Sequence, residues 1–247
     1  MIVIGIFGGT GGAGVDALAL AGALGSVADP KSIVVLTGAN GLTDTGVKGE
    51  AIRAADAAGV RWIGVNRAGL QGYLQSVGDR GLVVNTSLAD KRNVIEALLC
   101  DGAVCVPGSK GTVSEAVLAL SLGRPVAFWG DAWSQQMGLP LFAPATLTDL
   151  AERAHRHLVG SPPTQEIDDQ VSELVLNSRL TQAMPYSYWA TGTTSDRAET
   201  LGRARVILEW LQAAVAMRCT RRGSYLTWTP VFDSIDAWLR TGNLPVA

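Results

Sequence analysis

The stretch Val106-Pro107-Gly108-Ser109-Lys110-Gly111-Thr112-Val113-Ser114-Glu115 decides the fold of this chain. An apolar run, Ala103 to Val106, stops at a turn with two glycines, a lysine and a threonine, and an apolar helical pattern follows at once. A strand, a glycine-rich turn and a helix N-terminus together form a phosphate-binding geometry, because unpaired backbone N–H groups and the positive end of the helix dipole point at the anion. Lys110 would add a full positive charge beside that site, and Glu115 lies one turn into the helix.

The same residues allow a second interpretation. Thr112 and Glu115 have the spacing of a capping box, in which each side chain satisfies a backbone N–H group at the start of a helix. Many helices begin this way without binding a ligand. This segment alone therefore does not decide whether Glu115 caps the helix or acts in a functional site.

Short apolar strands alternate with helices through the first 130 residues, which is typical of a parallel sheet covered on both faces. We therefore predict an α/β fold with a doubly wound, Rossmann-like parallel sheet of at least six strands, forming a phosphate-binding domain over residues 1–130. The strands are expected at Ile2–Phe7, Ile33–Leu36, Val60–Val65, Leu82–Val84, Ala103–Val106 and Arg124–Trp129. The helices between them are expected to end near Leu24 and to span Thr45–Ala58, Leu88–Leu99 and Val113–Leu122, with a polar loop over Arg67–Arg80.

Beyond Asp131 this alternation stops, and residues 131–247 are predicted to form a helical extension packed on the sheet or on a second subunit. Its helices are expected at Thr148–Leu158, Glu166–Leu176, Ser195–Met217 and Val231–Leu239. Ser195 has the residue type of an N-cap, and Pro230 suits the first position of the last helix.

Composition narrows the class of protein. The chain has 247 residues, 47% of them hydrophobic, and a net charge of −2, so it can bury a large core and shows no basic surface for nucleic acid or an acidic membrane. No apolar run approaches the roughly 20 residues that span a bilayer, and the N-terminus has no positive segment typical of a signal peptide. Three scattered cysteines without metal-ligand spacing indicate reduced thiols in a cytoplasmic protein, and no metal site is predicted.

Glycine-rich turns follow three of the expected strands. The carboxyl ends of parallel strands are where α/β proteins bind ligands, so we expect a nucleotide-like or phosphorylated ligand there, although tight chain reversal alone would explain some of the glycines. The residues concerned are Gly8, Gly9 and Thr10 after the first strand, Gly38, Asn40 and Gly41 after the second, and Gly108, Ser109, Lys110, Gly111 and Thr112 after the fifth.

A dinucleotide fingerprint is also present, since Gly9-x-Gly11-x-x-Gly14 matches it letter for letter. An NAD-binding protein of this type would end its second strand in an acidic residue for the ribose hydroxyls, whereas this strand ends in Thr37-Gly38. An NAD-dependent oxidoreductase is therefore a third interpretation that rests on the fingerprint alone.

The order of these motifs resembles the superfamily that joins the Lonely Guy phosphoribohydrolases, which are lysine decarboxylase-like, to the molybdenum-cofactor carrier proteins. The resemblance covers about residues 1–130 and rests on Thr37–Gly41, Lys91-Arg92-Asn93, Pro107–Glu115 and Gly123–Val126. The Arg92-Asn93 pair and the Gly-Thr-x-Ser-Glu form are closer to the carrier branch. The Lonely Guy motif is Pro-Gly-Gly-x-Gly-Thr-x-x-Glu, and here Ser109 replaces its second glycine while Lys110 fills the variable place.

The resemblance implies roles for individual residues. Arg92 and Glu115 match the arginine and glutamate that act in the hydrolases, and Gly108, Gly111 and Thr112 match the phosphate-binding loop. The implied activity is hydrolysis of the N-glycosidic bond of a nucleoside 5′-monophosphate, for which no cofactor is required. The alternative is a non-catalytic carrier or sensor of a phosphorylated pterin, the molybdenum cofactor, or of a nucleotide, with Asn93 in the binding site.

The expected partners are a phosphorylated small molecule and a second copy of the chain, but no nucleic acid and no membrane. Apolar residues lie on more than one face of the helices expected at Leu88–Leu99 and Val113–Leu122, and a helix that is apolar all round is buried on both sides. The helical extension could cover the second side. A two-fold homodimer is the other solution, and we predict it, with Arg92 and Glu115 near the subunit seam.

Overall fold

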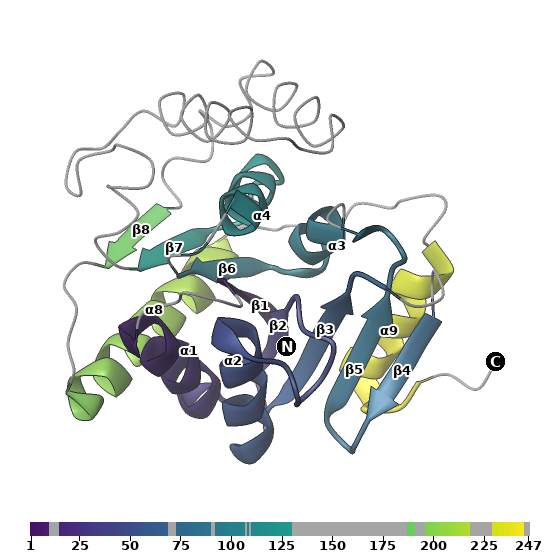
Figure 1. Ribbon diagram of the computed structural model, residues 1–247, viewed down its shortest axis with the longest axis horizontal. Coiled ribbons are helices and arrows are strands. Elements are labelled where there is room, and N and C mark those ends of the chain that lie inside the picture. Colours follow the sequence, from purple (N-terminus) through teal and green to yellow (C-terminus); the bar gives the residue numbers. More distant parts are fainter. Residues whose placement is uncertain are drawn as a thin grey trace.

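In the computed structural model of the protein, one sheet runs through the molecule, with strands in the order β4-β5-β3-β2-β1-β6-β7-β8 (Figure 1). The structure describes residues 1–9, 15–68, 73–89, 92–106, 108, 110–129, 187–190, 196–217 and 229–244. The strands are β1 (Ile2–Phe7), β2 (Ile33–Thr37), β3 (Arg61–Asn66), β4 (Tyr73–Val77), β5 (Gly81–Asn85), β6 (Gly102–Cys105), β7 (Val126–Trp129) and β8 (Ser187–Ala190). The helices are α1 (Val15–Val27), α2 (Gly46–Ala57), α3 (Arg92–Leu99), α4 (Lys110–Ser121), α8 (Arg197–Met217) and α9 (Thr229–Thr241).

The predicted doubly wound parallel sheet is confirmed. Strands β1, β2, β3, β5, β6, β7 and β8 pair in parallel. Strand β4 pairs antiparallel with β5 at the edge of the sheet, so the polar loop expected over Arg67–Arg80 was wrong in its second half. The apolar pattern missed this strand because Gln75 and Ser76, which are consecutive and belong to opposite faces of the sheet, are both exposed at its edge.

Helices cover both faces of the sheet, and each face has its own core. Helices α1, α2 and α8 pack on one face, where Leu20 and Ile52 meet the inward side chains of Val35 and Trp62. Helices α3, α4 and α9 pack on the other face, against residues such as Leu36 and Ile63. Because both faces are covered, the central strands carry apolar residues without alternation, which is the pattern seen in the sequence.

The segment after residue 130 contributes a strand as well as helices, and this corrects the expectation of a purely helical extension. Strand β8 extends the sheet beyond β7, while α8 and α9 agree with two of the expected helices. The N-cap of α8 is Asp196, whose Oδ1 accepts the N–H of Glu199 at 3.0 Å, and not Ser195, which lies outside the described residues. The helices expected at Thr148–Leu158 and Glu166–Leu176 also lie outside them.

Helix α3 begins at Arg92, four residues later than the sequence pattern predicted. Ser87 and Ala89 have φ angles of 52° and 48°, in the left-handed region, so the backbone before Arg92 cannot continue the helix. Helix α2 agrees with its expected bounds, with Thr45 as its N-cap. None of the helices in the described ranges is long and apolar enough to cross a membrane.

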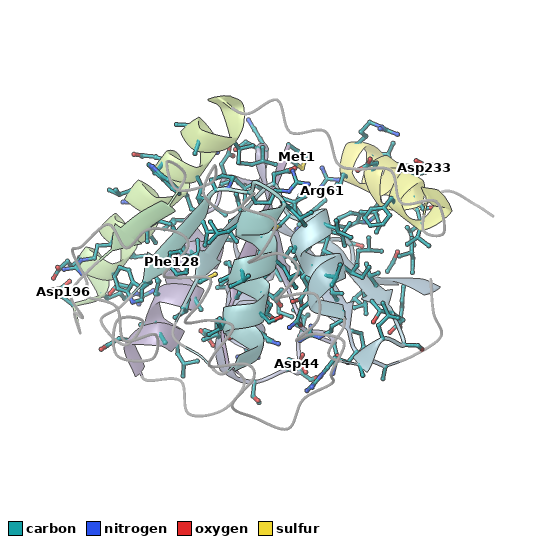
Figure 2. All side chains as sticks on the ribbon, turned by 90° about the horizontal axis from the view of Figure 1, so that it is seen from above. Met1, Asp44, Arg61, Phe128, Asp196 and Asp233 are labelled. Carbon is teal, nitrogen blue, oxygen red and sulfur yellow. The ribbon has the colours of Figure 1, made fainter. Side chains whose placement is uncertain are left out.

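The topology fixes where a ligand would bind. Strands β1 and β6 are neighbours, but the helix after β1 packs on one face of the sheet and the helix after β6 on the other. Because the two connections leave in opposite directions, they leave room beyond the carboxyl ends of β1 and β6. This place, where the connections change face, is called the switch point below. In Figure 2, Met1 and Arg61, at the amino ends of β1 and β3, lie at one end of the strands. Asp44, which follows the carboxyl end of β2, lies at the opposite end.

Candidate functional site

Two of the predicted glycine turns meet at the switch point. A Cβ atom added to Gly108 would lie 2.8 Å from the backbone nitrogen of Gly9 and 2.3 Å from Oγ1 of Thr112, so only glycine fits there without a shift. The Gly9 carbonyl in turn accepts the N–H of Val47 at 3.2 Å, which joins this junction to α2. Gly9 after β1 therefore lies against both Gly108 after β6 and the first turn of α2.

Part of the predicted phosphate-binding set lies outside the described residues. Thr10 and Ser109 are not described, and Lys110 is described only as the first residue of α4. Gly8 is buried against Val47, since a Cβ atom there would lie 2.5 Å from the Cγ1 atom of that valine. Gly111 is part-exposed on the first turn of α4.

The capping-box interpretation of Thr112 and Glu115 was wrong. Helix α4 begins at Lys110, so Thr112 is already its third residue and cannot be the N-cap. The side chain of Glu115 is 2% exposed and lies 3.9 Å, from Oε1 to Nζ, from Lys48 of α2. The side chain of Glu115 is therefore directed toward α2 and not toward the end of its own helix.

Arg92 is buried, and its side chain spans the ends of two strands. Its Nη1 atom donates a hydrogen bond to the carbonyl of Val65, the next-to-last residue of β3, at 2.7 Å, and it also forms an ion pair with Oε1 of Glu96. A Cβ atom on Gly38, directly after β2, would lie 1.9 Å from the same Nη1 atom. The glycine after the second strand thus makes room for a guanidinium group of the protein itself.

Lys48 and Glu96 are charged residues of this site that sequence reasoning missed. Glu96 is fully buried on α3, one turn after Arg92, and Lys48 is 8% exposed in the first turn of α2. A lysine in the first turn opposes the helix dipole, and that unfavourable position is a signal that could have identified it. Glu96 stands four residues after Arg92 on the same helix, the spacing of a helical ion pair, and that spacing is the signal that could have identified it.

The four charged side chains act on one another. Burial raises the pKa of Glu115 well above its usual value, and the nearby Glu96 charge and a hydrogen bond to Glu96 raise it further, whereas Lys48 and Arg92 oppose the shift. Burial also raises the pKa of the Cys105 thiol, and the charge of Glu115 adds to that effect. Burial therefore holds Glu115 toward its protonated form.

Several buried polar atoms at this site have no hydrogen-bond partner within the described part of the chain. A buried polar group without a partner costs roughly 1–3 kcal/mol, and folded proteins contain few of them. Their concentration in and beside the Arg92–Glu115 group is the arrangement expected where a ligand supplies partners. These atoms are Thr37 Oγ1, Arg92 Nε, Glu96 Oε2, Ser114 Oγ and Glu115 Oε2.

The remaining predicted residues lie at the margin of this group. The Asn93 Nδ2 atom donates to the carbonyl of Gly111 at 3.3 Å, which ties α3 to the first turn of α4. Asn40 is exposed, and its backbone N–H is already bonded to Asp44 Oδ2 at 2.6 Å, while Gly41 follows it with a φ of 149°. Asn93 thus supports the loop, whereas the N–H of Asn40 is not free to bind an anion.

A cavity of about 460 Å³ lies elsewhere, on the helical layer formed by α1, α2 and the start of α8. Its lining includes Asp16, Glu50 and Arg197 together with small residues of α1, and it contains none of the predicted site residues. The charged group at the switch point, and not this cavity, joins the residues that the sequence marked.

Comparisons with known proteins give one family model and several similar solved structures. A sequence model of the SLOG cluster4 family matches residues 1–148. A molybdenum cofactor binding protein from the phototrophic bacterium Rippkaea orientalis is similar in structure, with 20% identity, a TM-score of 0.47, and coverage of 83% of this chain and 97% of that one. A Moco carrier protein from Chlamydomonas reinhardtii has 21% identity and a TM-score of 0.49, with coverage of 86% and 98%. At these values the two structures say nothing of what this chain binds. No curated protein sequence gives a significant match.

Proposed function

The chain belongs to the SLOG cluster4 family, and from this premise we propose that its switch-point site binds a phosphorylated small molecule, a nucleotide or a phosphorylated pterin. The membership agrees with the superfamily resemblance read from the sequence, which joins hydrolases and carriers. The backbone surface formed by Gly9, Gly108 and the start of α4 would hold the phosphate through N–H groups and the helix dipole.

We propose as the leading function that the protein hydrolyses the N-glycosidic bond of a nucleoside 5′-monophosphate. The observation that carries this proposal is the burial of Arg92 and Glu115 together, with unpartnered polar atoms on both, beside the glycine turns. As the base leaves, C1′ of the ribose becomes positively charged, and a carboxyl group held nearby in a dry site can stabilise that charge or activate water. Arg92 would fix the phosphate or the ribose through its forked donors.

Release of free base from a panel of nucleoside 5′-monophosphates tests this proposal. We expect release from at least one of them, and loss of it in Glu115→Ala. Glu209→Ala is the matched control, because Glu209 is an exposed glutamate of α8 remote in sequence from the site. Binding of nucleotides without release of base from any of them would contradict the enzymatic proposal.

The second candidate is a non-catalytic carrier or sensor of a phosphorylated pterin or nucleotide. It is favoured by the fact that Arg92 is already engaged by Val65 and Glu96, and Asn93 by Gly111, so both side chains serve to shape a binding surface. If the site binds the molybdenum cofactor, the same backbone surface would hold its phosphate. Native mass spectrometry of the purified protein identifies the ligand: retained molybdopterin indicates a carrier, whereas a retained nucleotide fits both candidates, and release of base from it then separates the hydrolase from the sensor.

A further inference from the structure

A lysine and a glutamate from opposite faces of the sheet meet at the switch point. Lys48 belongs to α2, which packs on one face, and Glu115 belongs to α4, which packs on the other. Helices on opposite faces can approach each other only beyond the ends of the strands, so this pair lies where the topology leaves room for a ligand. Both side chains are buried, with 11% of Lys48 and 2% of Glu115 exposed.

The two side chains do not satisfy each other. The Nζ atom of Lys48 lies 3.9 Å from Oε1 of Glu115, which is longer than a hydrogen bond. The ammonium group carries only donors, and the Oε2 atom of Glu115 has no hydrogen-bond partner within the described ranges. Because buried polar groups without partners cost free energy, a polar group of a ligand beside this pair would be stabilised by both residues.

We propose that Lys48 is a further ligand-binding residue, which together with Glu115 holds a ribose hydroxyl of a nucleotide and selects against nucleotides that lack this hydroxyl. The inference rests on the proposed binding of a nucleotide at the switch point. A hydroxyl oxygen suits both members of the pair, because it accepts a hydrogen bond from an ammonium group and donates one to a carboxyl oxygen. An ionised phosphate oxygen can only accept.

The position of the pair along α4 separates it from the proposed phosphate site. Helix α4 begins at Lys110, and Glu115 follows five residues later. At a rise of about 1.5 Å per residue, Glu115 lies about 7.5 Å along the helix from the N–H groups that would hold the phosphate. In a nucleoside 5′-monophosphate the group attached to the phosphate is the ribose, so its hydroxyls are the oxygens that can reach the pair.

Calorimetric titration with a ribonucleoside 5′-monophosphate and with its 2′-deoxy and 3′-deoxy analogues tests the role of Lys48. We expect the wild type to bind at least one deoxy analogue about tenfold more weakly than the ribonucleotide. Lys48→Met removes the charge from an unbranched side chain, and its loss of affinity should be about tenfold greater for the ribonucleotide than for that analogue or for inorganic phosphate. Lys31→Met, at an exposed lysine before β2, should leave every affinity unchanged.

An equal loss for all of these ligands in Lys48→Met would overturn the proposal, because Lys48 would then act on the phosphate or on the fold alone. If Lys48→Met does not fold, Lys48→Gln takes its place, since an amide stays polar at the buried position. Equal binding of the ribonucleotide and both deoxy analogues by the wild type would also exclude a hydroxyl at the pair.

Failure of the proposed function gives a different result. If no nucleotide binds the wild type, the proposed function and this inference both fall. If nucleotides bind without release of base, but Lys48→Met removes the preference for the hydroxyl, only the hydrolysis is contradicted and the role of Lys48 is supported.

Discussion

Glu115 connects the chemistry of the site to the stability of the fold, because its carboxyl group is buried between other charges. Its pKa is raised in the folded protein by burial first and by Glu96 second, whereas in the unfolded chain it returns to the ordinary value of about 4.3. Between those two pH values the folded state binds more protons than the unfolded state, so this group makes the protein less stable as pH rises. Below the unfolded value the effect disappears, since both states are protonated.

We expect Glu115→Gln to remove this pH dependence. The free energy of unfolding of the variant minus that of the wild type should increase as pH rises from about 4 and level off above the folded pKa of Glu115. Urea denaturation at a series of pH values measures the difference, with Glu209→Gln as the control. A difference that stays constant with pH would show that Glu115 ionises in the folded protein as it does in water.

Gly38 provides a second prediction at the scale of one residue. Its missing Cβ atom would lie 1.9 Å from Arg92 Nη1 and 2.3 Å from Glu96 Oε1, so Gly38→Ala must push the ion pair aside. We expect a loss of about 1–3 kcal/mol of stability, as for other overpacked sites, together with weaker nucleotide binding. Gly202→Ala in α8 is the control, because nothing lies within 4 Å of its added Cβ and stability should rise by up to about 1 kcal/mol. Equal effects of the two substitutions would contradict the packing of Arg92 on Gly38.

Part of the site could be predicted from the sequence, because some of its residues follow glycine turns with a recognisable spacing and others do not. Arg92 and Glu115 stand beside glycine turns with recognisable spacing, and the structure buries both together. Glu96 stands four residues after Arg92 on α3, a spacing that the sequence also shows, whereas only the folded chain brings Lys48 of α2 to Glu115. Interactions between helices on opposite faces of a sheet leave no local spacing in a sequence.

Helix α9 is expected to contribute strongly to the stability of the fold through one buried tryptophan. Its Trp238 is 1% exposed within the core on the α3 and α4 side, and the guanidinium of Arg61 in β3 lies 5.5 Å from the centre of its ring. We expect Trp238→Ala to cost about 3–5 kcal/mol in urea denaturation, while Trp238→Phe costs less because it keeps an aromatic ring. A loss below 1 kcal/mol for the alanine variant would mean that α9 is not part of the folding unit.

The helices and strands could be predicted where they are buried, because buried elements carry recognisable runs of apolar residues. Strands β1, β2, β3 and β6 are buried over most of their length, and their apolar runs marked them within one residue at most ends. Strand β4 is half-exposed, and its polar residues concealed it. The start of α3 was missed because Ser87 and Ala89 adopt left-handed backbone angles, which serine and alanine rarely adopt and which the sequence therefore does not predict.

For the whole molecule, the open question is whether two copies of the chain form a homodimer. The sequence predicted a homodimer because the helices expected at Leu88–Leu99 and Val113–Leu122 are apolar on more than one face. In the structure every residue of α4 from Thr112 to Leu120, and every residue of α3 except Val94, is buried within a single chain. The homodimer therefore stays a prediction, and the apolar helices no longer require it. Analytical ultracentrifugation at micromolar concentration is the measurement, and a single species near the chain mass of 25.8 kDa would contradict it.

The place of β8 in the sheet has a consequence for how the protein is made. Strand β7 gains its second neighbour only when residues 187–190 have been synthesised, long after β7 itself. Until then a nascent chain exposes the open edge of a nearly complete parallel sheet, and unpaired edges of this kind recruit other chains. The ribosome-bound protein is thus most vulnerable to aggregation late in translation, and a pause in synthesis between β7 and β8 should lower its yield more than a pause before β6.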